Sequence, residues 1–417
     1  MVGGGMQGGK IRILFHLSHF GRGGTETSLI NWIRALDGKR FSPSVSVTWP
    51  SEALDFWIGH SLPSDVPVHV LTNNSWINYL NHTARERKLS VWEKIALKLL
   101  TYLLARPSFS WAYRRLARDH DVIVDFDCSL RHLAGRFGKP WIGVSHYSFS
   151  ARLAGKSSSY VRRRMRHYAR YNVLAVLTPS MHRELKEWMG PRRIKIRELP
   201  NVFDVSNLRQ LASVPPPILP EDFFISVARL DKTQKDYETL LKSFALMHRS
   251  ETSNVALLLV GDGPDREYLQ RLAKELGIDG KVHFLGFNKN PFPLIRAAKA
   301  LILSSRYEGM PMVLVEAMAL GTPVISSDCP VGPHDLLEGG KNGVLTPVGD
   351  VETMTAAMTR LLHDSALREK YSANGLVRAE EFSPSKANQR MLALMDELLK
   401  RRDPSSSPMG EIQGAKS

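Results

Sequence analysis

Two glutamates, Glu308 and Glu316, stand eight positions apart in a segment that runs from a short apolar run into a helical pattern. If Glu308 ends a loop and Glu316 lies two turns into the helix, their backbones are about 12 Å apart. That separation suits one carboxylate binding the hydroxyls of a sugar and the other binding a ribose, with a diphosphate between them at the helix N-terminus. Pro311 fits the first helical turn, where its missing N–H costs nothing. The alternative is a solvated loop carboxylate and a second one on a polar helix face.

Two cations offer the complementary charge. Arg229 follows an apolar run at residues 223–227, and Lys235 comes six residues later. An arginine presents a forked, permanently charged donor to phosphate, and a lysine presents a mobile point charge. Placed just after a strand, the pair predicts a site for a leaving diphosphate, whereas either residue alone is an ordinary surface cation.

Glycine-rich turns follow two other apolar runs. Gly23 and Gly24 lie between a run at 11–16 and a helical pattern from about residue 27, and a Gly-Asp-Gly-Pro turn covers 261–264. Glycine lets backbone N–H groups approach phosphate or sugar oxygens. Neither turn has the G-x-G-x-x-G spacing, and such turns are common between strands and helices.

A metal site has little support in the sequence. Asp125 and Asp127 form a D-x-D at the end of an apolar run, but that run lies in the half away from the diphosphate candidates. We expect both to be turn or cap residues before Ser129, with no metal and no cofactor. The two cysteines, Cys128 and Cys329, are too few and too far apart for a disulfide framework or a zinc cluster and suit a reducing compartment.

Short β-branched runs alternate with longer amphipathic stretches along the chain, as in parallel strands joined by crossover helices. Strands are expected at residues 11–16, 45–48, 66–71, 122–125, 141–145, 173–178, 194–199, 223–227, 255–260, 282–285, 300–304 and 324–326. Helices are expected from 237 and over 264–276, 293–298, 312–320, 351–362 and 384–399. The fold class is therefore α/β, with two Rossmann-like doubly wound parallel sheets facing a cleft.

A proline-rich segment at 213–221 can continue neither a helix nor a central strand and marks the domain boundary. The expected divisions are a disordered tail at 1–9, a first Rossmann-like domain at 10–212, the linker at 213–221, a second Rossmann-like domain at 222–383, a helix at 384–401 that packs back towards the first domain, and a disordered tail at 402–417. Ligands of open α/β sheets bind beyond the carboxyl ends of the strands, so the chemical motifs should meet between the domains.

Charge is distributed unevenly along the 417 residues. Residues 1–210 carry 32 Lys/Arg against 15 Asp/Glu, whereas residues 211–417 carry 24 against 26, for a formal net charge of +15. A basic first half suits nucleic acid, an anionic membrane or a phosphorylated substrate. No run approaches the roughly 20 apolar residues of a membrane span, and the first residues lack a secretory h-region.

These motifs, in this order, resemble the GT-B retaining glycosyltransferases of family 4. The resemblance covers residues 11–399 and depends most on the segment from Glu308 to Glu316 with its following Gly321-Thr322-Pro323. Leu199-Pro200-Asn201 and the segment 283–287 also match. The sequence of residues 328–333 is similar to that of family members that build bacterial capsule, O-antigen and glycolipid chains.

The resemblance implies a role for each matched residue. Arg229 and Lys235 hold the diphosphate, Glu316 the ribose, and Glu308 with the amides of 309–312 the donor sugar. His146 takes the place of a family histidine at the donor sugar. The full set of expected site residues is Glu308, Arg229, Lys235 and His146 as catalytic, and Gly23, Gly24, Phe287, Gly309, Met310, Met312 and Glu316 as substrate-binding.

The expected activity is metal-independent front-face transfer of a hexose or N-acetylhexosamine from a nucleotide sugar, UDP-linked by preference, to a lipid-linked or polysaccharide acceptor. A GDP-mannose-dependent mannosyltransferase and a nucleotide-sugar epimerase of the same architecture stay open as alternatives, and so does a catalytically silent binder. Nucleic acid is not expected as a partner, because no RNA-binding signature accompanies the basic residues.

Two basic stretches of the first half suggest where an anionic membrane would bind. The apolar run at 95–104 has basic flanks and suits an interfacial helix or, equally, a core helix. The arginine-rich run at 160–170 suits lipid headgroups, the pyrophosphate of a polyprenyl acceptor or simply solvent. The expected location is cytoplasmic, peripheral on the cytoplasmic face of a membrane.

Overall fold

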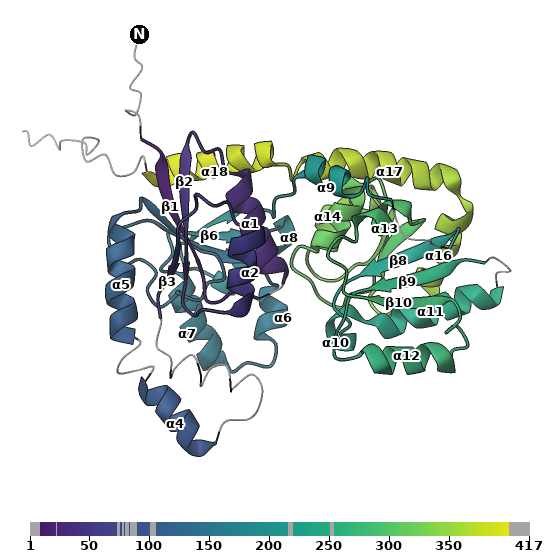
Figure 1. The fold of residues 1–417 in the computed structure, drawn as a ribbon, viewed down its shortest axis with the longest axis horizontal. Coiled ribbons are helices and arrows are strands. Elements are labelled where there is room, and N and C mark those ends of the chain that lie inside the picture. The colour runs from purple at the N-terminus through teal and green to yellow at the C-terminus, as the bar shows by residue number, and fades with distance from the viewer. Residues whose placement is uncertain are drawn as a thin grey trace, which may run out of the picture.

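The computed structural model describes residues 9–21, 23–72, 76, 79, 83, 90–100, 106–215, 220–250 and 254–399. The tails expected at 1–9 and 402–417 lie, apart from residue 9, outside this part of the chain, as does 216–219 of the expected linker. Two open parallel sheets with helices on both faces make up the fold (Figure 1). The expected α/β class is confirmed.

Within the described residues, the first sheet has seven strands in the order β3-β2-β1-β4-β5-β6-β7. They are β1 (Ile11–Leu17), β2 (Phe41–Val47), β3 (Val68–Val70), β4 (Val122–Asp125), β5 (Trp141–Ser145), β6 (Val173–Val176) and β7 (Lys195–Glu198). The described helices before the linker are α1 (Gly24–Ala35), α2 (Glu52–His60), α4 (Val91–Leu100), α5 (Arg106–Arg118), α6 (Phe149–Leu153), α7 (Ser158–Tyr168), α8 (Pro179–Met189) and α9 (Val205–Leu211).

The second sheet has six described strands in the order β10-β9-β8-β11-β12-β13. They are β8 (Phe223–Val227), β9 (Ala256–Val260), β10 (Val282–Gly286), β11 (Ala300–Leu303), β12 (Val324–Ser327) and β13 (Val344–Thr346). The helices are α10 (Lys232–Lys235), α11 (Tyr237–Ser250), α12 (Arg266–Glu275), α13 (Phe292–Ala297), α14 (Met312–Ala319), α15 (Pro333–Leu336), α16 (Val351–His363), α17 (Ser365–Glu380) and α18 (Pro384–Leu399).

Central strands are buried along their whole length, as β5 and β9 are, because helices cover both faces of each sheet. Each sheet also reverses its strand order once, between β1 and β4 in the first and between β8 and β11 in the second. Loops that leave the two strands of such a switch point diverge to opposite faces and leave space for a ligand.

The chain crosses between the two halves twice. At the first crossing Phe203 donates its N–H to the carbonyl of Phe382, 2.9 Å away, so both crossings lie side by side. After the second crossing, α18 runs along the first domain (Figure 1). There Asn388 bonds to Ala35 and Asp37 of the α1 end at 2.5 and 2.8 Å.

The first crossing comes before α9, ahead of the proline-rich segment that we expected to divide the domains. The helix α9 packs against α13 and α14 of the second half. Arg209 of α9 donates to the carbonyl of Ala319 at 3.1 Å. Proline marks where regular structure stops, whereas the buried side chains of Val205 and Leu208 decide which core the helix joins.

Candidate active site

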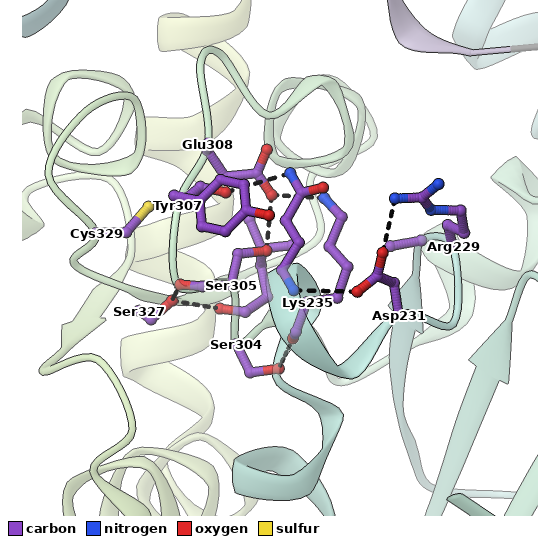
Figure 2. Close-up of polar contacts among 12 residues, drawn as sticks. Arg229, Asp231, Lys235, Ser304, Ser305, Tyr307, Glu308, Ser327 and Cys329 are labelled. Atoms are coloured by element: carbon purple, nitrogen blue, oxygen red, sulfur yellow. Dashed lines mark hydrogen bonds and ion pairs between the residues drawn. The ribbon is translucent and has the colours of Figure 1, made fainter. Parts of the chain in front are cut away.

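The switch point of the second sheet brings together one predicted cation and one predicted carboxylate. Lys235, the last residue of α10, places its Nζ 2.5 Å from Oε1 of Glu308, in the loop after β11 (Figure 2). The hydroxyl of Ser305 donates to the same oxygen at 2.7 Å. Glu308 is nearly buried, so the ion pair is shielded from water and the carboxylate is held in one orientation.

Backbone bonds hold these two loops against each other. Arg306 donates its N–H to the carbonyl of Gln234 at 2.8 Å, and the hydroxyl of Ser304 donates to the carbonyl of Lys235 at 2.7 Å. Asp236 adopts a left-handed conformation, with φ of 49°, and pairs its buried carboxylate with Arg306 at 3.0 Å. The position of Lys235 therefore depends on contacts with a loop about 70 residues away in the chain.

Arg229 lies apart from this pair. Its Nη2 is 2.7 Å from the carboxylate of Asp231, its side chain is 63% exposed, and Figure 2 shows it on the other side of Asp231 from Lys235. Asp231 also caps α10 through the N–H groups of Thr233 and Gln234. The structure thus leaves Arg229 accessible to a ligand while Lys235 is already engaged.

Glu316 stands in a different environment from Glu308. Because α14 begins at Met312, Glu316 is just over one turn into the helix rather than the expected two turns. The carboxyl is partly buried and forms no hydrogen bond or ion pair with the residues that the structure describes. Burial raises its pKa to about 7. Glu316 is therefore a partly buried carboxyl without hydrogen-bond donors from the described residues. The two hydroxyls of a ribose could supply those donors.

Glycines allow the loops of the site to approach one another. A Cβ on Gly261 would come within 2.0 Å of the carbonyl oxygen of Ala228, and one on Gly263 within 2.3 Å of that of Leu230. These contacts join the loop after β9 to the loop after β8. The Gly-Asp-Gly-Pro turn, a weak signal in the sequence, is a requirement of backbone packing.

Gly309 brings the two domains into contact. A Cβ there would lie 2.0 Å from the carbonyl oxygen of His146 in the first domain. The sulfur of Met312, at the start of α14, lies 3.7 Å from where a Cβ on Gly24 would be. The sulfur of Met310 lies 3.3 Å from the N–H of Asn201. Four expected substrate-binding residues, Gly24, Gly309, Met310 and Met312, therefore lie where the domains meet.

The first glycine loop owes its shape to a residue that the sequence analysis did not single out. The carboxylate of Glu26 accepts the N–H groups of Gly21 and Gly23 at 3.0 and 3.2 Å. Glu26 is the third residue of α1 and its spacing from Gly23 is that of a capping box. That spacing is the signal that could have identified it.

His146 lies at the carboxyl end of β5 as expected, buried to 8% exposure, with its ring 4.7 Å from that of Phe126. Burial lowers its pKa to about 4, so the imidazole is neutral. Its Nε2 has no hydrogen-bond partner among the described residues. A buried ring nitrogen without a partner is available to a hydroxyl of a substrate.

The two aspartates of the D-x-D are turn residues. Asp125 and Asp127 both accept the N–H of Ser129, at 3.1 and 3.0 Å, and Asp127 also accepts the hydroxyl of Ser18 at 2.6 Å. Within the described residues there is no group of three or more His, Cys, Asp or Glu able to hold a metal ion. His16, which no motif indicated, is buried beside this turn with its pKa lowered to about 4 by burial.

Phe287 is the expected site residue least engaged by the protein. It follows β10, which β9 separates from the switch point of the second sheet, and it is 67% exposed. Its open ring face is free to stack on a planar ligand group, but it is not brought into contact with Lys235 or Glu308.

Comparison with known proteins identifies the second half of the chain. Residues 214–378 match the family model described as glycosyl transferases group 1. Over these residues the chain is similar to the group 1 glycosyl transferases. The Lys235–Glu308 pair, Glu316 and the Gly-Asp-Gly-Pro turn all lie within the matched segment.

Relatives and solved structures agree with that assignment. The chain is 30% identical over 254 residues to an uncharacterized glycosyltransferase of Methanocaldococcus jannaschii, covering 52% of this chain and 62% of that protein. It is 32% identical over 183 residues to the lipopolysaccharide 1,6-galactosyltransferase of Salmonella typhimurium, covering 43% of this chain and 50% of that protein. The chain thus matches only about half to three fifths of the length of these two relatives.

A match of the whole fold comes from a solved structure. HepE of Anabaena, determined in complex with UDP and glucose, aligns with 93% of this chain and 100% of its own, at a TM-score of 0.72 and 20% identity. A likeness at this identity establishes the shared fold, and it confirms the GT-B arrangement of two sheets.

Proposed function

We propose that the protein is a retaining glycosyltransferase that moves a hexose or N-acetylhexosamine from a nucleotide sugar to a lipid-linked or polysaccharide acceptor. The observation that carries the proposal is the Lys235–Glu308 pair at the switch point of a group 1 glycosyl transferase domain. UDP is the favoured nucleotide because HepE, which shares the fold, was solved with UDP and glucose.

The donor would lie across the C-terminal domain. The unpartnered carboxyl of Glu316 accepts the ribose hydroxyls, and Glu308 with the amides that follow it receives the sugar. Arg229 turns from Asp231 to the diphosphate, since its exposed side chain is free to move. Lys235 already lies beside Glu308, so this one cation contacts both the carboxylate that binds the sugar and the phosphate.

Catalysis then rests on stabilising the leaving group and on positioning. In front-face substitution the departing diphosphate oxygen takes the proton of the acceptor hydroxyl while the new glycosidic bond forms on the same face. Arg229 and Lys235 offset the negative charge that develops, and Glu308 orients the sugar and offsets oxocarbenium charge. Neutral His146 contacts the donor sugar from the first domain. We expect activity to survive EDTA.

A thermal-shift panel of nucleotide sugars tests the donor assignment. A ligand at 100 times its Kd should stabilise the protein by about 2.7 kcal/mol. We expect stabilisation by a UDP-sugar, and a larger effect of GDP-mannose would favour the mannosyltransferase alternative. Conversion of the donor sugar without any acceptor would favour the epimerase. No stabilisation by any UDP- or GDP-sugar would overturn the donor site.

The first domain would bind an anionic membrane surface. The helix α4 presents Val91, Trp92, Ile95 and Leu99 to solvent, with 69, 79, 43 and 54% of each residue exposed, and these positions lie on one helical face. Figure 1 shows α4 at the outer end of the domain, below α5 and α7, whose described sequences contain arginines and no acidic residue. An apolar face with basic neighbours is typical of interfacial helices.

Sedimentation with vesicles tests the membrane assignment. We expect binding to anionic vesicles that weakens as salt is raised, and at least a tenfold loss in Trp92→Glu. The matched control is Val377→Glu, since Val377 is 75% exposed on α17 of the other domain. Equal loss in both variants, or binding that is insensitive to salt, would contradict an interfacial role for α4. Among the residues that the structure describes, no helix is both long and apolar enough to cross a bilayer.

A further inference from the structure

A buried arginine of α7 has no anionic partner. Arg164 is 8% exposed, and its Nε and Nη1 donate to the hydroxyls of Tyr168 and Tyr160 at 3.1 and 2.9 Å. Its Nη2 is buried without a hydrogen-bond partner among the described residues. No carboxylate in this part of the chain pairs with its guanidinium.

Further cations surround this arginine. The pKa of the Tyr160 phenol is lowered, chiefly by the charge of Arg164 and further by those of Arg131 and Lys156. Arg163 and Arg166 stand exposed on α7, which contains no acidic residue. Within the part of the chain that the structure describes, no carboxylate pairs with Arg164, and α7 itself supplies none.

Contact with the rings of the two tyrosines offsets only part of the cost of burying the Arg164 charge. The guanidinium carbon lies 5.9 Å from the Tyr160 ring centroid and 5.5 Å from that of Tyr168, which permits cation–π attraction. A buried cation next to other cations nevertheless remains costly until an anion balances it. The guanidinium fork fits phosphate oxygens, and tyrosine hydroxyls can donate to the same group.

This surface is linked to the candidate active site through α6. The ring of Tyr168 packs edge-on against that of Phe149, at 5.4 Å, in the first turn of α6. Arg152, also of α6, lies 5.6 Å from the ring of Tyr147, the neighbour of His146. The charge of Arg152 acts on Tyr168 together with that of Arg164. These contacts connect the cations of α6 and α7 to Tyr147, the residue that follows His146.

We propose that Arg164, with Arg131, Arg152 and Lys156, binds a phosphate or diphosphate group carried by the acceptor. The proposal rests on the proposed function and names the acceptor class, a phosphorylated one. On binding, Nη2 of Arg164 turns to the phosphate, and Tyr160, which lies at the surface above the guanidinium, moves aside. A lipid-linked diphosphate and a soluble phosphorylated saccharide present the same chemistry to this site.

Calorimetric titration with inorganic pyrophosphate tests the site in the full-length chain. Because the donor site also binds diphosphate, the titration is made with UDP at saturation, which occupies that site. Under these conditions we expect a pyrophosphate-binding event that weakens at least tenfold in Arg164→Gln and also in Lys156→Gln, a substitution at an exposed residue. Unchanged pyrophosphate affinity in both variants would overturn the proposal.

Stability separates a binding role from a structural one. Without ligand, Arg164→Gln should be at least as stable as the parent, because it removes an uncompensated buried cation. A large drop in its melting temperature, with Lys156→Gln binding normally, would assign Arg164 to packing and overturn the site. Arg115→Gln, an exposed arginine of α5, is the matched control and should bind pyrophosphate as the parent does.

Two further measurements identify the source of the phosphate and distinguish this proposal from the proposed function. A prenyl diphosphate in micelles that binds more tightly than inorganic pyrophosphate indicates a lipid-linked acceptor, and equal binding indicates a soluble one. Stabilisation of Arg164→Gln by nucleotide sugars should equal that of the parent chain. Loss of nucleotide-sugar binding in the parent chain, with pyrophosphate still dependent on Arg164, would remove the proposed function and leave the anion site standing.

Discussion

At the level of single residues, the site contains one carboxylate that the protein satisfies and one that it does not. Glu308 has both a cation and a hydroxyl at its Oε1, so its carboxylate is held in one orientation. Glu316 has no such partner among the described residues, and burial alone raises its pKa. The two glutamates therefore differ in what a ligand must bring to each.

The arginine prediction concerns the developing charge of the leaving group. Arg229→Ala should lower kcat by 100-fold or more while changing donor affinity by only a few-fold, because the interaction is strongest in the transition state. Steady-state kinetics with matched binding measurements check this. A near-normal kcat would remove Arg229 from catalysis.

Glu316 predicts a dependence of stability on pH. Its folded pKa of about 7 lies above the ordinary value of 4.5, so between these values the folded protein holds a proton that the unfolded chain has lost. The contribution of this group to the free energy of unfolding is therefore complete below about pH 4.5 and is lost as pH rises to about 7, by at most about 3 kcal/mol.

Urea unfolding at pH 5 and pH 7.5 measures this effect as a difference between variants. Glu316→Gln should show a smaller fall in stability across this interval than the parent chain, because the amide does not titrate. Equal falls in both proteins would mean that the carboxyl titrates normally. Saturating donor should reduce the fall in the parent chain, since ribose hydroxyls favour the ionised form.

At the level of elements, the loops after β5, β8, β9 and β11 reach their positions because glycine leaves room for backbone to pass. The loop after β11 meets β5 across the domain boundary at Gly309, and the loop after β9 meets the loop after β8 at Gly261. Side chains of Lys235 and Glu308 then meet because their loops leave the two strands of a switch point.

A methyl group at residue 309 should separate these loops. Gly309→Ala places a Cβ 2.0 Å from the carbonyl oxygen of His146, so backbone must shift by about 1 Å or more. We expect kcat/KM to fall about 100-fold, the cost of a misplacement of that size. Gly280→Ala, where no atom lies within 4 Å of the added carbon, is the matched control and should retain full activity.

At the level of the whole molecule, the two domains are held together by specific polar contacts as well as by the two chain crossings. Asp335 of α15 in the second domain accepts the N–H of Ser180 at 2.8 Å and also its hydroxyl, at the N-terminus of α8 in the first. A carboxylate in this position also benefits from the helix dipole. The contact joins the domains on the side of the candidate active site.

Asp335→Asn should loosen this contact, because the amide loses the charge and one acceptor. We expect a larger radius of gyration by small-angle scattering and a raised KM for the donor, with the secondary structure unchanged. Asp328→Asn, a change at an exposed aspartate of the same segment, serves as the control. The same compact scattering profile in both variants would show that Asp335 does not hold the domains together.

Much of the fold was predictable, since continuous apolar runs mark strands that are covered on both faces. The prediction missed β13, a strand of three residues that is only partly buried, and it included residues 205–211 in the first domain, whereas α9 packs against α13 and α14. At the site, the sequence indicated Glu308, Glu316, Arg229 and Lys235. It could not indicate His16 or the isolation of Arg164, because burial and the absence of a partner depend on residues from many elements.

The sequence alone determined the types of groups available, the α/β class and the strands after which the chemical groups come, because these depend on local periodicity and short motifs. Tertiary structure decided which groups meet: Lys235 binds Glu308 while Arg229 binds Asp231. It also decided which ionisable side chains lack an oppositely charged partner among the described residues, Glu316 in the second domain and Arg164 in the first. Such outcomes follow from strand order and from the packing of distant loops, which bring together residues that no local pattern relates.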